Sequence, residues 1–198
     1  MRLVLASASP RRAELLRQIR LSFEVRAVEL DESVRPGESA ADYVVRLAVA
    51  KAEAARAALP PGDPAVCLGA DTAVVLDGRV LGKPAGREEG VAMLLALGGR
   101  THAVLTGIAA SGPAGTLSRC VTTEVRFRPI ERWEAEAYWA TGEGADKAGG
   151  YGIQGIGGIF ADSIRGSYSA VVGLPLAETE QLLRDSGLDT WRERTSDA

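Results

Sequence analysis

The N-terminal segment constrains the fold most, because an apolar run is followed at once by the start of a helix. Leu3 to Ala6 is wholly apolar and predicts a strand. Ser9 is a favourable N-cap, and Pro10 suits the first helical position, where its missing N–H costs nothing. In an open α/β sheet, ligands lie beyond the carboxyl ends of the strands. The S-A-S-P-R-R loop at residues 7–12 is therefore a candidate binding loop.

The same loop has the chemistry of an anion site. The free N–H groups of a first helical turn carry the positive end of the helix dipole, and Arg11 and Arg12 add donors that match phosphate oxygens. Phosphate is the first ligand to consider. The alternative is that Ser9 and Pro10 merely cap a helix whose arginines are solvated, and the short motif alone leaves it open.

Length and charge limit the classes of function. The 198 residues, 46% hydrophobic and 25% charged, suffice for one globular domain with a substantial core. The net charge of −3 argues against a surface for polymeric nucleic acid, which needs a basic excess. No apolar run reaches the length of a membrane span, and Arg11 and Arg12 interrupt the N-terminal apolar start. We therefore expect no membrane partner, no signal peptide and a cytoplasmic location.

Cysteine and histidine usage gives little support to metal or triad chemistry. Cys67 and Cys120 lie far apart in strand-like segments, so buried free thiols are expected rather than a zinc site. His102 is the only histidine, and no G-x-S-x-G elbow accompanies it. A Ser-His-Asp triad is therefore disfavoured.

Periodicity and turn signals predict the remaining elements. Helices are expected at 39–59, 88–97, 130–140 and 176–184. Strands are expected at 21–28, 65–70 with an extended continuation at 73–76, 79–81, 101–110, 117–127, 159–164 and 168–172. The stretch 146–158 contains six glycines, which excludes a regular helix, and it matches neither a dinucleotide fingerprint nor a Walker loop. Trp133 and Tyr138 are interpreted as core residues. The tail after Leu188 is expected to be polar and frayed.

Polar residues gather at the expected strand ends and loops. They are Ser7, Arg11, Arg12, Glu32, Lys51, Asp71, Thr72, Lys83, Asp146, Lys147 and Gln154. Phosphoanhydride hydrolysis needs cations for a triphosphate, carboxylates for a divalent metal and a group that orients or deprotonates water. Taken singly, most of these residues are more simply interpreted as solvated surface charges. Asp71 differs, because an acid directly after a wholly apolar strand must lie at a sheet edge or cleft.

Seven motifs together resemble one known family. They are S-A-S-P-R-R at 7–12, Glu32, G-A-D-T at 69–72, G-K-P at 82–84, T-H-x-V-x-T-G at 101–107, D-K-A-G-x-Y-G-I-Q-G at 146–155 and V-V-G-L-P at 171–175. In order and spacing they resemble the Maf family of nucleoside triphosphate pyrophosphatases. Y-G-I-Q-G is similar to the branch of that family that hydrolyses dTTP and UTP. Ala170 replaces an Asn that is frequent in relatives, and this change touches none of the charged positions.

The resemblance implies a fold and an activity. The implied fold is α/β, with an elongated mixed sheet flanked by helices in an α/β/α arrangement, in a single domain with two lobes around a cleft. That domain is expected to span 1–190, with a polar tail at 191–198, and to form a homodimer. The implied reaction converts dTTP and UTP to the monophosphate and pyrophosphate with Mg or Mn, which would clear non-preferred or modified nucleotides.

The resemblance also implies roles for individual residues. Catalytic roles fall to Asp71, Lys51 and Lys83, metal binding to Glu32 and Asp71, and substrate binding to Ser7, Arg11, Arg12, Thr72 and Gln154. Asp71 would be the proton acceptor. A carboxylate that ligates a metal is a weak base, however, so Asp71 either takes a proton from water or positions a metal-bound water.

Gln154 is suited to reading a pyrimidine edge. Its amide offers one acceptor beside one donor, which matches the N3–H and carbonyl of uracil and thymine. Cytosine inverts this pattern and a free glutamine could flip to suit it, so selectivity needs neighbours that fix the amide. The close backbone at Gly152, Gly155 and Gly157 is the expected source. We expect both UTP and dTTP to be accepted.

Two other functions stay open. The family is associated with septum formation, so one alternative is a nucleotide-binding regulator of cell division without turnover. The other is a pyrophosphatase that acts on a different, modified nucleotide.

Overall fold

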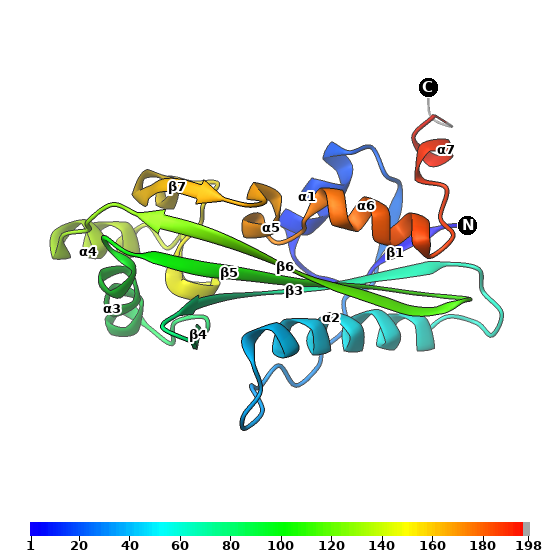
Figure 1. Ribbon diagram of the computed structural model, residues 1–198, viewed down its shortest axis with the longest axis horizontal. Coiled ribbons are helices and arrows are strands. Elements are labelled where there is room, and N and C mark those ends of the chain that lie inside the picture. Colours follow the sequence, from blue (N-terminus) through cyan, green and yellow to red (C-terminus); the bar gives the residue numbers. More distant parts are fainter. Residues whose placement is uncertain (196–198) are drawn as a thin grey trace. The chain divides into compact units, whose positions relative to one another are not determined.

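Helices and strands alternate along the chain of the computed structural model, which describes residues 1–195 (Figure 1). The elements are β1 Leu3–Leu5, α1 Pro10–Gln18, β2 Phe23–Val25, α2 Ala40–Ala57, β3 Val66–Leu76, β4 Arg79–Leu81, α3 Arg87–Leu97, β5 Thr101–Gly112, β6 Gly115–Phe127, α4 Arg132–Ala140, the 3-10 helices η1 Ala148–Gly150 and η2 Ile156–Phe160, β7 Ala161–Arg165, α5 Tyr168–Val172, α6 Leu176–Asp185 and α7 Thr190–Thr195.

Seven strands within residues 1–195 form one mixed sheet in the order β2-β1-β3-β5-β6-β7, with β4 paired to β3. β1 runs parallel to β2 and β3, whereas β4 is antiparallel to β3 and β7 to β6. Helices flank this sheet, so the predicted α/β class is confirmed. The chain forms two compact units, whose boundaries fall inside β3, β5 and β6. Unit 1 contains 1–71, 106–121 and the residues from Gly173 on; unit 2 contains 72–105 and 122–172.

In unit 1 the central strands are covered on both faces. Val4 of β1 pairs with Cys67 of β3, and both are fully buried. Figure 1 shows α2 against one face of these strands and α1 and α6 on the other. An apolar run without alternation is what a doubly covered strand requires, which explains the composition of residues 65–70.

α2 packs unusually close to the sheet, because small residues line the contact. Ala48 and Ala52 form a buried cluster with Ala109 of β5. A Cβ placed on Gly69 would lie 2.1 Å from the carbonyl oxygen of Ala48, and one on Gly107 would lie 2.3 Å from that of Val44. Only glycine is compatible with this spacing between α2, β3 and β5.

Unit 2 has an aromatic core that includes the single histidine. Phe127, Tyr151 and Phe160 are buried, and the ring centroid of His102 lies 4.8 Å from that of Phe127. His102 Nε2 shares a 2.8 Å hydrogen bond with the hydroxyl of Tyr151. Burial lowers the pKa of His102 to about 4. The residue is thus a neutral core imidazole rather than part of a Ser-His-Asp triad.

This histidine predicts a pH dependence of stability. In the unfolded chain, histidine has a pKa of ~6.5 and takes up a proton as the pH falls below this value. In the native state, His102 stays neutral until about pH 4. The free energy of unfolding should therefore fall as the pH drops through this window, by up to ~1.4 kcal/mol per unit. His102→Gln removes the titration, so the wild-type-minus-variant difference in urea unfolding should shrink between pH 7.5 and pH 5. A difference that is constant across this range contradicts the interpretation.

Four segments differ from the sequence-based prediction. The strand expected at 21–28 is confined to β2, and residues 159 and 160 of the strand expected at 159–164 belong to η2. Residues 168–172, expected as a strand, form α5, because the hydroxyl of Ser167 accepts the N–H of Ala170 and starts a helical turn. Short apolar runs fit either element. The tail expected to fray after Leu188 contains α7, where Arg194 donates to the carbonyl of Ile19 and pairs with Glu180 at 2.6 Å. The last three residues, 196–198, lie outside the described chain.

Two side chains also lie where the sequence did not place them. Trp133 is 65% exposed, because α4 turns Ala135 and Tyr138 inward and Trp133 outward. Cys120 is exposed rather than buried, since it shares its face of β6 with the exposed even-numbered residues 122, 124 and 126. Cys67 is buried as expected, which raises the pKa of its thiol. Within the described chain, no helix has the length and apolar character needed to cross a bilayer.

Candidate functional site

The loop after β1 folds around the hydroxyl of Ser7. This residue is buried, and its Oγ accepts a hydrogen bond from the Ser9 N–H and one from Arg12 Nη1, both at 3.2 Å. Arg12 Nε also donates to the carbonyl of Gly173 at 2.9 Å. With both hydroxyl lone pairs engaged, the group that Ser7 can offer to a further acceptor is its O–H. Arg11 is half-buried on the first turn of α1.

The most concentrated charge in unit 1 surrounds Lys51. Its Nζ, on α2, lies 2.7 Å from Asp71 Oδ1 on β3 and 2.6 Å from Glu32 Oε1 in the loop after β2. Asp71, expected directly after the end of a strand, lies inside β3, because β3 continues past it to pair with β4. Lys51 and Asp71 are buried, whereas the Glu32 side chain is 48% exposed. The close seating of α2 on β3 is what lets the lysine reach the strand. One cation thus bridges two of the predicted carboxylates.

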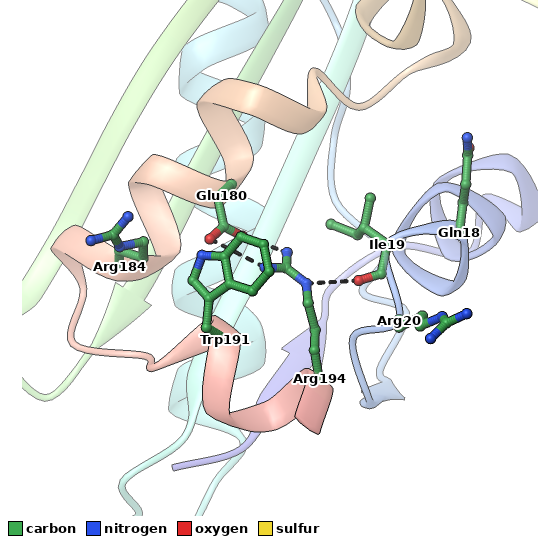
Figure 2. Close-up of a pocket in the computed structure, with 7 residues that line it drawn as sticks. All are labelled: Gln18, Ile19, Arg20, Glu180, Arg184, Trp191 and Arg194. Atoms are coloured by element: carbon green, nitrogen blue, oxygen red, sulfur yellow. Dashed lines mark hydrogen bonds and ion pairs between the residues drawn. The ribbon is translucent and has the colours of Figure 1, made fainter. Parts of the chain in front are cut away.

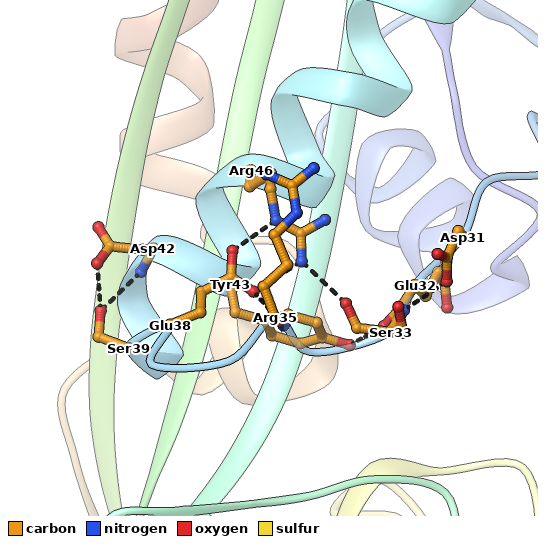
Figure 3. Close-up of polar contacts among 9 residues, drawn as sticks. All are labelled: Asp31, Glu32, Ser33, Arg35, Glu38, Ser39, Asp42, Tyr43 and Arg46. Carbon is orange, nitrogen blue, oxygen red and sulfur yellow. Dashed lines mark hydrogen bonds and ion pairs between the residues drawn. The ribbon is translucent and has the colours of Figure 1, made fainter.

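A polar network holds the loop that carries Glu32 (Figure 3). The hydroxyl of Tyr43 donates to the carbonyl of Glu32 at 3.0 Å, and Arg46 Nη2 donates to the carbonyl of Ser33 at 3.0 Å. Arg46 also makes a two-pronged ion pair with Glu38, which lowers the pKa of Glu38 to about 2. These α2 side chains restrain the backbone directly C-terminal to the Glu32 side chain, at the carbonyls of Glu32 and Ser33.

The pKa shifts of Arg12 and Tyr43 reflect burial first and nearby charges second. Burial lowers the pKa of Arg12, and the nearby charges of Asp71 and Glu32 partly offset that effect. Burial, followed by the negative charges of Asp71 and Glu32, raises the pKa of Tyr43 to about 12. The charges of Asp71 and Glu32 therefore affect the pKa values of both Arg12 and Tyr43.

The two carboxylates form a partial cation site. Glu32 and Asp71 each place an oxygen within 2.7 Å of one ammonium nitrogen, so positive charge is stabilised at this point. Among residues 1–195, no group of three or more His, Cys, Asp or Glu is arranged to hold a metal. Magnesium is commonly held by one or two carboxylates together with substrate phosphates. The donor set fits a metal of this kind.

Unit 2 carries the other predicted site residues. Thr72 is half-buried on β3, whereas Lys83 and Gln154 are exposed in loops. The N–H of Gly149 donates to the carbonyl of Gly82 at 3.0 Å, which joins the G-K-P loop to the glycine-rich segment. Gly149 has a φ of +71° and a Cβ there would meet Val74 at 3.0 Å, so glycine is required.

A surface pocket of about 540 Å³ lies elsewhere in unit 1 (Figure 2). It is lined by residues 18–20 at the C-terminal end of α1 and by α6 and α7 residues that include Glu180 and Trp191. Arg11 and Arg12 occupy the opposite, N-terminal end of α1. None of the predicted site residues lines this pocket, so it is not the anion site.

Sequence reasoning missed several residues that position the site. Tyr43, Arg46 and Glu143 were not singled out, although each holds a loop that carries a predicted site residue. A usable signal existed for Glu143. The stretch 146–158, which contains six glycines and cannot form a regular helix, has backbone N–H groups that need acceptors, and an acid lies close by in the chain.

Comparison with known proteins gives a consistent result. The family model described as Maf-like protein matches residues 2–186. A dTTP/UTP pyrophosphatase of Saccharophagus degradans is 53% identical over 191 residues, which covers 96% of this chain and 91% of the relative. A dTTP/UTP pyrophosphatase of Colwellia psychrerythraea is 50% identical over 188 residues, covering 94% and 89% respectively.

Among solved structures, the nucleoside-triphosphatase, or dITP/XTP pyrophosphatase, of Mycobacterium abscessus is similar with a TM-score of 0.41 and 20% identity. The match covers 66% of this chain and 76% of that protein.

Proposed function

This chain belongs to the Maf family, and we propose that it hydrolyses dTTP and UTP to the nucleoside monophosphate and pyrophosphate. The observation that carries the proposal is the buried Lys51, whose ammonium joins Asp71 and Glu32 beside the Ser7 and Arg12 loop. The two relatives described above, at 50% identity or more over nearly the whole chain, support the choice of substrate.

We assign phosphate binding to Ser7, Arg12, Lys51 and Lys83. The O–H of Ser7 and the guanidinium of Arg12 provide donors beside the first turn of α1, where the helix dipole favours an anion. Lys51 compensates two carboxylates in the structure, so a phosphate that competes for its ammonium would leave those carboxylates available to a cation. Arg11 and Thr72 are proposed to contribute to substrate placement.

We assign proton acceptance to Asp71. Lys51 engages Oδ1, so Oδ2 is the atom proposed to take a proton from the attacking water. The water attacks the α-phosphorus, the bond to the bridging oxygen of the β-phosphate breaks, and pyrophosphate leaves. Glu32 and Asp71 would hold Mg or Mn, which supplies Lewis-acid stabilisation of the phosphate charge.

The direct test is a panel of the common triphosphates with magnesium or manganese, with the products identified. UMP plus pyrophosphate from UTP, and the corresponding products from dTTP, are expected. Binding without formation of monophosphate would instead indicate a nucleotide-binding regulator. Turnover of only modified nucleotides would indicate the third alternative.

Gln154 is proposed to select the base. Gln154→Ala removes the paired donor and acceptor, so the ratio of kcat/KM for UTP over CTP should fall by about tenfold or more. Inhibition by inorganic tripolyphosphate, which has no base, should be unchanged. Gln181→Ala is the matched control, because Gln181 is an exposed residue of α6 that bonds Asp185. An unaltered base profile in Gln154→Ala would remove Gln154 from base recognition.

Three further features stay predictions. These are the domain extent of 1–190, a homodimer and a cytoplasmic location. Light scattering on the purified chain tests the homodimer, a truncation after residue 190 tests the domain boundary, and fractionation of cells tests the location.

A further inference from the structure

The segment that carries Gln154 is anchored by one carboxylate. Glu143 lies just after α4, and its Oε2 accepts the N–H of Ile156 at 2.8 Å. Its Oε1 accepts the N–H of Gly157 at 2.9 Å. The chain is therefore fixed two and three residues after Gln154.

A tyrosine hydroxyl fixes the same segment before Gln154. Tyr138 on α4 donates to Glu143 Oε1 at 2.9 Å and accepts the N–H of Gly152 at 3.0 Å. Its ring is buried beside Phe160, with centroids 5.3 Å apart. Glu143 and Tyr138 thus hold the backbone on both sides of Gln154 through hydrogen bonds.

Three glycines of this segment leave room for the Glu143 carboxylate and the Tyr138 hydroxyl. A Cβ on Gly155 would lie 2.2 Å from Glu143 Oε2, and one on Gly157 would lie 2.9 Å from the hydroxyl of Tyr138. On Gly152 it would lie 3.1 Å from Glu143 Oε1. Any side chain at Gly155 would displace the carboxylate. The Y-G-I-Q-G run is therefore shaped around Glu143 as well as around a ligand.

The carboxylate is kept charged where it acts. Burial alone would raise the pKa of Glu143, but the N–H groups of Gly157 and Ile156 and the hydroxyl of Tyr138 lower it below its usual range. Lys147 contributes in the same direction, and its Nζ donates to the backbone carbonyl of Glu143. Charged acceptors make stronger hydrogen bonds to N–H groups than neutral ones.

We propose that Glu143 and Tyr138 are positioning residues for base selection, acting through Gln154, an inference that rests on the proposed function. Gln154 is exposed, and holding the backbone on both sides of it limits the positions from which its amide can reach a base edge. The two anchors provide that restraint by accepting backbone N–H groups on both sides of Gln154.

The test is Glu143→Gln, which keeps the volume but replaces one acceptor oxygen with an NH₂ that confronts a backbone N–H. We expect the kcat/KM ratio of UTP over CTP to fall by about tenfold, through KM for UTP, with kcat nearly unchanged. Tyr138→Phe should shift the ratio in the same direction. Glu136→Gln is the matched control, because it makes the same substitution on α4 at a carboxylate that pairs with Arg87.

A coupling measurement separates positioning from general loosening. In a Gln154→Ala background, Glu143→Gln should change the base ratio by less than about twofold, because its effect passes through the missing amide. Val91→Ala, in the buried core of unit 2, should lower stability without altering the ratio.

Each outcome is decisive. Wild-type selectivity in folded Glu143→Gln, or an equal loss of selectivity in Val91→Ala, overturns the positioning role alone. Absence of any turnover by the wild-type chain overturns the proposed function and this inference with it. If Glu143→Gln lowers the kcat/KM ratio of UTP over CTP by the same factor in the wild-type and in the Gln154→Ala background, action through Gln154 is also rejected.

Discussion

Asp71→Asn is expected to reduce pyrophosphate release from UTP by about 10³-fold, the range found when a general base is removed. The amide has nearly the same shape, but it neither accepts a proton nor offers the negative charge that pairs with Lys51. Breaking a buried ion pair also costs stability, about 3 kcal/mol. Lys51 keeps Glu32 as a partner, so a folded protein is expected. Turnover should be measured at a temperature below the unfolding transition, with circular dichroism as the check on folding.

Two variants make this result interpretable. Asp63→Asn is the matched control, because Asp63 precedes β3 and pairs with Arg2 at 2.6 Å, so its turnover should stay near wild type. Glu32→Gln changes a half-exposed carboxylate with little risk to the fold and should still reduce turnover clearly. A folded Asp71→Asn enzyme with near-wild-type turnover would reject Asp71 as the proton acceptor.

Gly69→Ala should be the most destabilising single methyl addition in the chain's first unit. The new Cβ would lie 2.1 Å from the carbonyl oxygen of Ala48 and 2.7 Å from the N of Ala52. Both are backbone atoms, so no rotamer change relieves the clash and α2 itself must move. We expect the free energy of unfolding in urea to fall by about 3 kcal/mol. Activity should fall too, because moving α2 withdraws Lys51 from Asp71.

Gly86→Ala supplies the control for this stability measurement. Gly86 precedes α3 in extended backbone, and a Cβ there meets no atom within 4 Å. Its unfolding free energy should change by less than about 0.5 kcal/mol. Equal stabilities for Gly69→Ala and Gly86→Ala would show that α2 is not held at the distance described here.

Much of the fold could be predicted from local pattern. The helix predicted at 39–59 is α2, and the hydroxyl of Ser39 at its start accepts the N–H of Asp42. The two strands predicted at 101–110 and 117–127 are β5 and β6, which extend to 112 and back to 115. Prediction failed at residues 168–172, where a short apolar run suits a strand or a helix and the Ser167 cap decided for the helix.

The residues of the candidate site were likewise only partly predictable from the sequence. Ser7, Arg12 and Asp71 lie in motifs that indicated phosphate chemistry, whereas Lys51 lies in none of those motifs and, taken singly, was more simply interpreted as a solvated surface charge. The restraints on the site were harder to recognise. Arg46 donates to a backbone carbonyl 13 residues earlier in the chain, a partner that no local sequence pattern indicates, whereas the only signal for Glu143 was an acid close to a glycine-rich stretch.

By itself, the sequence determined the family, the alternation of strands and helices and the chemical types available to the site, because these depend on residue identity and short-range spacing. Only the tertiary structure decided that Lys51 bridges Asp71 and Glu32, and that Glu143 accepts backbone N–H groups of the segment that carries Gln154. Both arrangements depend on close backbone approach, at Gly69 and Gly107 for α2 and at Gly155 for the carboxylate. Such contacts join residues far apart in the chain or across a folded loop, so their geometry exists only once the whole chain has packed.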